Sequence, residues 1–174
     1  ALLLDETGRR MHKSWGNAIE FNMAADRMGV DVMRWLYSRQ KPEVNLLFGY
    51  GRATEVRRQF LLPLWNVYSF FVTYANIDQW APAVPWDEQG PESQNLLDRW
   101  ILSRLNQVVG QVTDRLDNYD AYGATLVVEP FVEDLTNWYV RRSRRRFWKS
   151  EHDTDKNAAY GTLYHVLVSL SRLL

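Results

Sequence analysis

The chain of 174 residues contains no cysteine and only three histidines. The absence of cysteine excludes a disulfide framework and every thiolate zinc site. The histidines, His12, His152 and His165, are widely separated along the sequence, so we expect no metal site. With 46% hydrophobic and 24% charged residues, the composition excludes intrinsic disorder. It fits one globular domain of about 150 residues or slightly more.

The chain also shows no cleavable secretion signal, because its opening leucines run directly into Asp5 and Glu6. Residues 59–77 carry no charge and are long enough to raise the question of a membrane span. Pro63 interrupts this stretch, and a polar seam follows one helical face, formed by Asn66, Ser69, Thr73 and Asn76. We therefore predict a mostly buried helix with one polar seam, and no membrane association.

The net charge is zero, but the two signs are segregated along the chain. Residues 1–60 carry ten basic and seven acidic side chains, residues 61–140 carry three and eleven, and residues 141–174 carry eight and three. This distribution fits either an anionic partner at the two basic ends or ion pairs between segments. Because the first residue is not methionine and the last lies in an apolar-periodic stretch, we expect a piece of a larger protein.

Hydrophobic periodicity predicts a short mixed start followed by helices. Residues 2–4 are typical of the end of a strand, and residues 10–17 of a basic loop. A short helix is expected from Asn22, its N-cap, to Met28, with Gly29 as its stop. Another is expected to begin at Asp31 and to end before Pro42.

Longer helices are predicted over residues 53–78, 97–116 and 121–148, and from Thr154, as N-cap, onwards. Pro63 and Pro130 are expected to kink two of them, and Asp98 and Asp117 are placed on polar positions. Residues 80–91 are expected to be irregular. Long helices joined by short loops indicate a mainly α fold, an up-down bundle of four or more helices.

The first candidate for chemistry is the loop Arg10–Asn17, which reads Arg-Met-His-Lys-Ser-Trp-Gly-Asn. Its glycine permits close approach of the backbone to an anion, and a lysine ammonium is a mobile point charge suited to polyphosphate. Phosphoryl and nucleotidyl transfer need such charge where negative charge develops. A Lys-Ser pair in a surface loop is more often simply solvated, so the loop alone does not establish nucleotide binding.

The second candidate is the arginine-rich segment 138–149. On a helical wheel its five arginines spread over one broad side: Arg141, Arg142, Arg144, Arg145 and Arg146. The opposite side holds Tyr139, Val140, Ser143 and Phe147. This pattern fits a helix that leaves a core and places arginines on RNA phosphates. The alternative is that the arginines pair with nearby carboxylates, such as Glu129, Glu133 and Asp134.

Four ordered blocks resemble the class I aminoacyl-tRNA synthetases. The loop Arg10–Asn17 resembles their Lys-Met-Ser-Lys-Ser-(Leu)-Gly-Asn signature, and residues 28–35 resemble the Gly-Ala-Asp-x-x-Arg stretch that follows it. Residues 57–66 and 98–106 also match, in the expected order. Residues 137–148 are similar to isoleucyl-tRNA synthetases specifically. The resemblance covers essentially the whole chain.

Carried over residue by residue, the resemblance implies that Lys13 is catalytic and stabilises the ATP phosphates while the adenylate forms. It assigns the rest of the ATP-binding loop to Arg10, Met11, His12 and Ser14. Three positions depart from the signature. Arg10 replaces a lysine but keeps its charge, His12 replaces a serine and adds a titratable donor, and Trp15 replaces the usual leucine.

The resemblance further implies a whole enzyme that uses ATP, with Mg²⁺, to activate isoleucine as an adenylate and transfers it to tRNA(Ile). We expect that parent protein to be monomeric and cytoplasmic. Residues 1–50 would be the C-terminal tail of its catalytic domain. Residues 51–174 would be a helical anticodon-binding domain, truncated at its C-terminus, with the five arginines on tRNA. Lacking the family's His-Ile-Gly-His loop, the segment should be inactive alone.

Three alternatives remain open at this point. Valyl or leucyl specificity is possible, because no residue of this chain is expected to line the amino-acid pocket. A free-standing RNA-binding helical module would account for the arginines but not for the loop. A plain helical scaffold would have all of its arginines paired internally.

Overall fold

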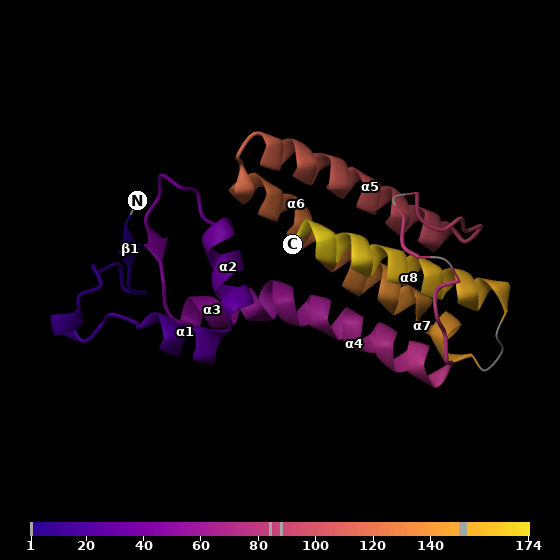
Figure 1. Cartoon of the computed structure of the whole chain (residues 1–174), viewed down its shortest axis with the longest axis horizontal. Helices are drawn as coiled ribbons and strands as arrows, with labels where there is room; N and C mark the ends of the chain where they lie inside the picture. Colours follow the sequence, from indigo (N-terminus) through magenta and orange to yellow (C-terminus); the bar gives the residue numbers. More distant parts are fainter. Residues whose placement is uncertain (1, 84, 88, 150–152) are drawn as a thin grey trace.

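The structure is a computed structural model that describes residues 2–83, 85–87, 89–149 and 153–174. A bundle of long helices lies beside a smaller lobe that contains the first residues (Figure 1). In the small lobe, strand β1 (Leu3–Leu4) pairs in parallel with β2 (Leu46–Leu47). The predicted fold class, mainly α after a short mixed start, is confirmed.

The small lobe also holds the single turn η1 (Lys13–Trp15) and the helices α1 (Phe21–Met28), α2 (Val30–Ser38) and α3 (Tyr50–Val56). These elements enclose a small apolar core of Ala24, Met28, Val32, Met33, Leu36, Leu46, Phe48, Ala53 and Val56.

The predicted N-cap of α1 is wrong, although the predicted stop is right. Glu20, not Asn22, caps the helix, because its carboxylate accepts a hydrogen bond from the Met23 backbone N–H at 3.0 Å. The Asn22 amide instead donates to the same carboxylate. Gly29, with φ at 89°, ends the helix in a conformation that other residues rarely adopt.

Helix α3 continues without a break through the π-helical turn η2 (Arg57–Leu61) into α4 (Leu62–Ile77). Pro63 has no N–H to donate, and its ring would crowd the carbonyl four residues earlier in an ordinary α-helix. The wider turn just before the proline, where the Leu62 N–H bonds to the Arg57 carbonyl, removes this conflict. The irregularity predicted at Pro63 is therefore a π turn.

The prediction that this helix is mostly buried is wrong. Within α4, Val67 and Ala75 are buried, but the large apolar side chains of Leu62, Trp65, Tyr68 and Ile77 are exposed. Its apolar residues face both the bundle and the surface. Among the described residues, no helix combines the length and apolar content that crossing a bilayer would need.

The bundle is completed by α5 (Leu96–Asp117), by a continuous run of α6 (Ala121–Glu133), the π turn η3 (Asp134–Val140) and α7 (Arg141–Trp148), and by α8 (Thr154–Leu173). The run passes through Pro130, and its irregularity lies beyond the proline, at η3. Asp153, rather than Thr154, caps α8 by accepting the Lys156 backbone N–H. The loop between α4 and α5 is irregular as predicted, although Val84 and Glu88 lie outside the described residues.

The apolar repeat predicted for α5 runs from Leu97 to Leu116, and the bundle core confirms its central part, although Leu116 is exposed. Ile101, Leu105, Val108 and Val112 are buried and pack against residues of α6 and α8. Asp98, predicted on a polar position, is fully buried. It lies three residues before Ile101, so it continues the buried stripe instead of the exposed face.

The small lobe and the bundle are connected by the continuous helix α3–η2–α4 and by side-chain contacts around Trp35. Trp35 of α2 stacks on Phe60, with ring centroids 4.0 Å apart, and its indole N–H donates to Glu129 of α6. Arg39 pairs with the same carboxylate at 3.0 Å. Apolar residues before position 57 pack in the small core, while Phe60 packs in the bundle. The division of the chain after residue 50 stays a prediction.

Candidate functional site

The loop of residues 10–17, called the signature loop below, is exposed and held by local hydrogen bonds. Asn17 closes it: its amide oxygen accepts the His12 backbone N–H at 2.9 Å, and its NH₂ group donates to the Arg10 carbonyl and to Asp5. Gly16, with φ at 71°, turns the chain at the end of η1. The loop is thus pinned at its base while its cationic tip stays in solvent.

The Asp5 carboxylate anchors this base. It accepts hydrogen bonds from the Thr7 hydroxyl, the Asn17 amide and the backbone N–H groups of Thr7 and Arg9. The Thr7 hydroxyl and then the Asn17 amide hold the pKa of Asp5 well below its usual range. Asp5 therefore stays ionised, and the loop keeps its anchor, under all ordinary conditions.

The predicted ATP-binding residues are gathered on this loop. Arg10, His12, Lys13 and Ser14 are exposed, and Met11 is half-buried against the small core. His12 Nδ1 lies 2.7 Å from the Ser14 hydroxyl, and the His12 and Trp15 rings are 5.3 Å apart. Neither Arg10 nor Lys13 forms an ion pair with another described residue. Both charges are free to meet an anion.

The predicted orientation of the arginine-rich helix is largely confirmed. Tyr139, Val140, Ser143 and Phe147 are buried. Arg141, Arg142, Arg144 and Arg145 are exposed, and within the described part of the chain none of them pairs with a carboxylate. The Arg142 guanidinium lies over the Trp138 ring, 4.5 Å from its centroid. Of the carboxylates considered as partners, Glu129 is engaged with Arg39 and Asp134 with Arg104, and Glu133 forms no ion pair with any of these described arginines.

Arg146 departs from the expected set, because it points into the bundle. Its guanidinium forms two bonds with Asp98, at 2.6 and 2.8 Å, and reaches the Asp155 carboxylate at 2.8 Å. Tyr139 donates its hydroxyl to the same Asp98 at 2.8 Å. Helix α7 carries five arginines in eight residues, and only the one next to Phe147 lies on its buried side. This fifth arginine does not share the exposed surface of the other four.

Burial and charge shift the pKa values of this cluster. Desolvation alone would lower the pKa of Arg146, but its bonds to Asp98 and Asp155 outweigh that effect and raise it. Burial, followed by the Asp98 charge, raises the pKa of Tyr139 well above its usual value. The guanidinium therefore stays charged and the phenol stays neutral, which fits a structural ion pair and not a proton-transfer site.

Two further features were not predicted. Lys156 is buried, and its ammonium lies 2.6 Å from both the Asp78 carboxylate and the Lys149 carbonyl. Asn137 of η3 and Asn66 of α4 line the same groove. The spacing of Asn137 from Arg141 and Arg144, four and seven residues, would have placed all three on one helix face.

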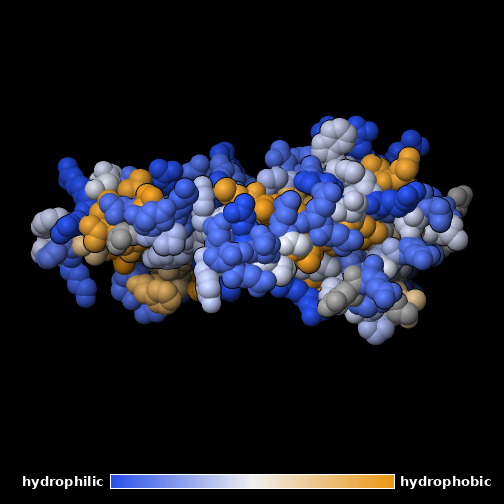
Figure 2. All heavy atoms as spheres, turned by 90° about the horizontal axis from the view of Figure 1, so that it is seen from above, coloured by the Kyte–Doolittle hydropathy of each residue, from blue (hydrophilic) through white to orange (hydrophobic). Residues whose placement is uncertain are grey.

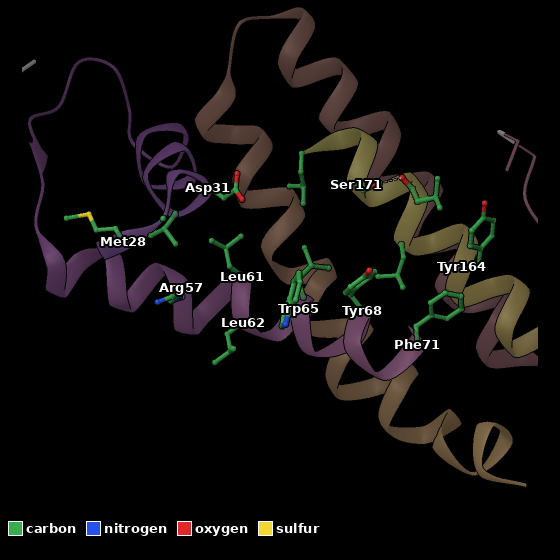
Figure 3. Close-up of a pocket in the computed structure, with 16 residues that line it drawn as sticks. Met28, Asp31, Arg57, Leu61, Leu62, Trp65, Tyr68, Phe71, Tyr164 and Ser171 are labelled. Carbon is green, nitrogen blue, oxygen red and sulfur yellow. Dashed lines mark hydrogen bonds between the residues drawn. The ribbon is translucent and has the colours of Figure 1, made fainter. Parts of the chain in front are cut away.

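One mainly apolar groove does not suit a nucleotide. It measures about 780 Å³ and lies mainly between α4 and α8, where Phe71 is close to Tyr164, and it extends to Met28 and Asp31 of the small lobe (Figure 3). Its lining is mainly apolar, whereas the face of the molecule seen in Figure 2 is mostly hydrophilic with separate hydrophobic clusters. Among the described residues, which exclude His152, no group of three or more histidine or acidic side chains could hold a metal ion.

Two comparisons with known proteins concern the fold of this chain. Residues 98–174 match the family model described as the anticodon-binding domain of tRNA ligase. A crystal structure of a ternary complex of the Agrobacterium radiobacter K84 AgnB2 LeuRS with tRNA and LeuAMS superposes with a TM-score of 0.71. That superposition covers 99% of this chain and 20% of the other at 16% sequence identity, so it shows a shared fold alone.

The sequence relatives are more specific. The isoleucine–tRNA ligase of Dehalococcoides mccartyi is 54% identical over 174 residues, which cover 99% of this chain and 17% of that protein. The Thermus thermophilus isoleucine–tRNA ligase is 44% identical, covering 99% and 16%. The chain thus spans a small part of the length of these relatives. Over its whole length, the chain is homologous to one segment of the isoleucine–tRNA ligases, and it carries an anticodon-binding domain of the tRNA ligase type.

Proposed function

We propose that this chain is the part of an isoleucine–tRNA ligase that contributes the ATP-phosphate loop and the helices that bind tRNA. The parent enzyme would join isoleucine to AMP, release pyrophosphate and pass the isoleucyl group to tRNA(Ile). The names of the relatives favour isoleucine over valine or leucine. The proposal depends mainly on one observation. Two exposed groups of cationic side chains, one on the signature loop and one on α7, form no ion pairs with described residues.

The loop geometry fits a polyphosphate. Arg10 and Lys13 are exposed on a segment whose base is fixed by Asn17, and Gly16 keeps the backbone turn free of a side chain. The Lys13 ammonium would stabilise charge as it develops on the phosphates during attack by the isoleucine carboxylate. Mg²⁺ bound with ATP would neutralise further phosphate charge, and we assign no residue of this chain to that ion.

The first test removes the loop charge in the full-length ligase. Because a charge that acts mainly in the transition state is lost, Lys13→Ala should lower the rate of ATP–pyrophosphate exchange about 100-fold or more while isoleucine binding stays nearly unchanged. Lys41→Ala, which removes an exposed lysine outside the family-like segments, is the matched control and should leave exchange intact. An unchanged exchange rate in Lys13→Ala would show that the loop does not act on ATP.

The second test addresses tRNA. Exposed arginines bind RNA phosphates with release of counterions, so affinity should fall steeply with salt. The double variant Arg142→Ala/Arg145→Ala should weaken binding of a tRNA(Ile) transcript in a gel shift and reduce the slope of log affinity against log salt by about 2. Arg99→Ala, an exposed arginine of α5, serves as control. Equal slopes for wild type and double variant would leave α7 without a role in tRNA binding.

A further inference from the structure

A polar groove of about 390 Å³ lies between α4 and the run η3–α7, two elements that pass side by side in the bundle (Figure 1). Its volume falls within the range of roughly 300–1,000 Å³ that is usual for small-molecule sites. The lining, which we call the amide groove, consists of Pro63, Asn66, Val67, Phe70, Thr136, Asn137, Val140, Arg141 and Arg144.

The rim of the amide groove carries hydrogen-bonding groups without partners. Asn137, Arg141 and Arg144 follow steps of four and three and share one helix face, and Asn66 lines the same groove. All four side chains are exposed, and none forms a hydrogen bond or ion pair with another described residue. By contrast, the exposed Arg115 is engaged with Asp120 at 2.9 Å. The rim therefore presents two amides and two cations to solvent.

The floor of the groove is apolar and firmly held. Val67 and Val140 are buried, and Phe70 packs edge-on against Phe147 with ring centroids 5.1 Å apart. Asn137 lies in the π turn η3, and the Thr136 hydroxyl is within hydrogen-bond distance of the Val132 and Glu133 backbone carbonyls, at 2.9 and 3.0 Å. Such turns occur frequently at functional sites.

This combination matches one kind of ligand. An unpaired nucleotide offers a base edge that both donates and accepts hydrogen bonds, an apolar base face and a phosphate. Amides complement the base edge, the apolar floor complements the face, and guanidinium groups complement the phosphate. A simple anion would use the arginines but neither the amides nor the floor. Beside the groove, the half-exposed Trp138 with Arg142 over it offers a stacking surface for a neighbouring base.

We propose that the amide groove binds one unpaired nucleotide of tRNA, with Asn66 and Asn137 on the base edge and Arg141 and Arg144 on the phosphates. This proposal rests on the proposed function, since it names how the tRNA is held. It goes further than phosphate contact, because it makes binding depend on the presence of a particular base.

The test combines groove variants with defects in the RNA. The full-length ligase is titrated with a tRNA(Ile) transcript and with a set of transcripts that each carry one abasic site at an unpaired position. For wild type, one abasic position should weaken binding about tenfold. Asn66→Ala/Asn137→Ala should weaken binding of the intact transcript to a similar extent and should show no further loss at that position, because the two changes remove the same contact.

Controls keep the outcomes distinct. Asn106→Ala removes an exposed amide from α5 and should behave as wild type. If the asparagine variant binds every transcript as wild type does while Arg142→Ala/Arg145→Ala is weakened, the groove proposal is wrong and the proposed function stands. If the wild-type ligase lost affinity equally for every abasic transcript, the groove proposal would also be wrong, because no single base would then be required. If no variant, including the arginine pair, changes the affinity for tRNA, both proposals are wrong.

Discussion

The signature loop and the far end of the bundle both concentrate charge, but they hold it in opposite ways. The loop keeps Arg10 and Lys13 in solvent, tied only at its base by Asn17. At the bundle end away from the small lobe, Asp98, Arg146 and Tyr139 form a buried cluster that joins α5, η3 and α7 (Figure 1). Charged residues are thus exposed to solvent in one region and part of the buried architecture in the other.

The difference follows from burial. An exposed ion pair contributes little, whereas a buried charge that loses its partner is strongly destabilising. The bundle end must therefore stay intact for the chain to fold, while the loop can rearrange at little energetic expense. The contribution of a charged or titratable residue to stability should therefore depend on how deeply it is buried. Three experiments test this dependence.

The largest effect is expected at the buried cluster. Asp98→Ala would leave the Arg146 guanidinium without its bidentate partner and the Tyr139 hydroxyl without its acceptor. Removing one member of a buried pair should lower the free energy of unfolding by about 3–5 kcal/mol. Urea denaturation measures it. Asp117→Ala, an exposed carboxylate on the same helix, should change it by less than about 0.5 kcal/mol. Equal effects at the two positions would contradict the distinction.

An intermediate effect is expected at His165, which stacks on Trp86 and lies near Ser169. Burial lowers its pKa below the ordinary value of 6.5, against a smaller opposing effect of Asp87. The unfolded chain therefore binds a proton more readily than the folded one, and stability should decline as pH falls through and below 6.5.

Thermal unfolding measured at several pH values between about 7.5 and about 5.5 follows this decline. The variant His165→Gln should show a smaller loss over the same interval, because the group that takes up the proton is gone. His12→Gln, which changes an exposed histidine of the signature loop, is the matched control and should keep the wild-type decline. A wild-type decline in His165→Gln would assign the pH dependence to other groups.

The smallest effect on stability is expected in the signature loop. Asn17→Ala removes the acceptor of the His12 backbone N–H and two donated bonds. The free energy of unfolding should change by no more than about 0.5 kcal/mol, but hydrogen exchange at the His12 amide should accelerate. Destabilisation comparable to that of Asp98→Ala would show that the loop is part of the core.

The sequence predicts the elements better than their partners. Steps of three and four along α5 locate its buried stripe, and the wheel of α7 separates the buried Tyr139 and Phe147 from most of the arginines. Asp98 also lies on the stripe, but its charge suggested that it is exposed. The partner that allows its burial, Arg146, is 48 residues away and could not be recognised from the local sequence. Local periodicity predicts which side of a helix a residue occupies, but it carries no information about ion pairs between residues far apart in the sequence.

The composition of α4 misleads for a related reason. Its apolar residues suggested burial on nearly all sides, yet Trp65 and Tyr68 are exposed because the described neighbours cover only part of the helix. For the candidate sites, sequence located the loop and the arginine-rich helix. The amide groove could not be predicted, because it requires Asn66 and Asn137, far apart in sequence, to line the same groove.

The uninterrupted passage from α3 through η2 into α4 has a mechanical consequence. This continuous helix lies at one end in the small lobe and at the other in the bundle, so no flexible linker separates the two parts. The hydrogen bond from Trp35 to Glu129 is a second connection between the small lobe and the bundle. Any reorientation of one half must be taken up by bending at the widened turn of residues 57–61, where the backbone already departs from regular winding.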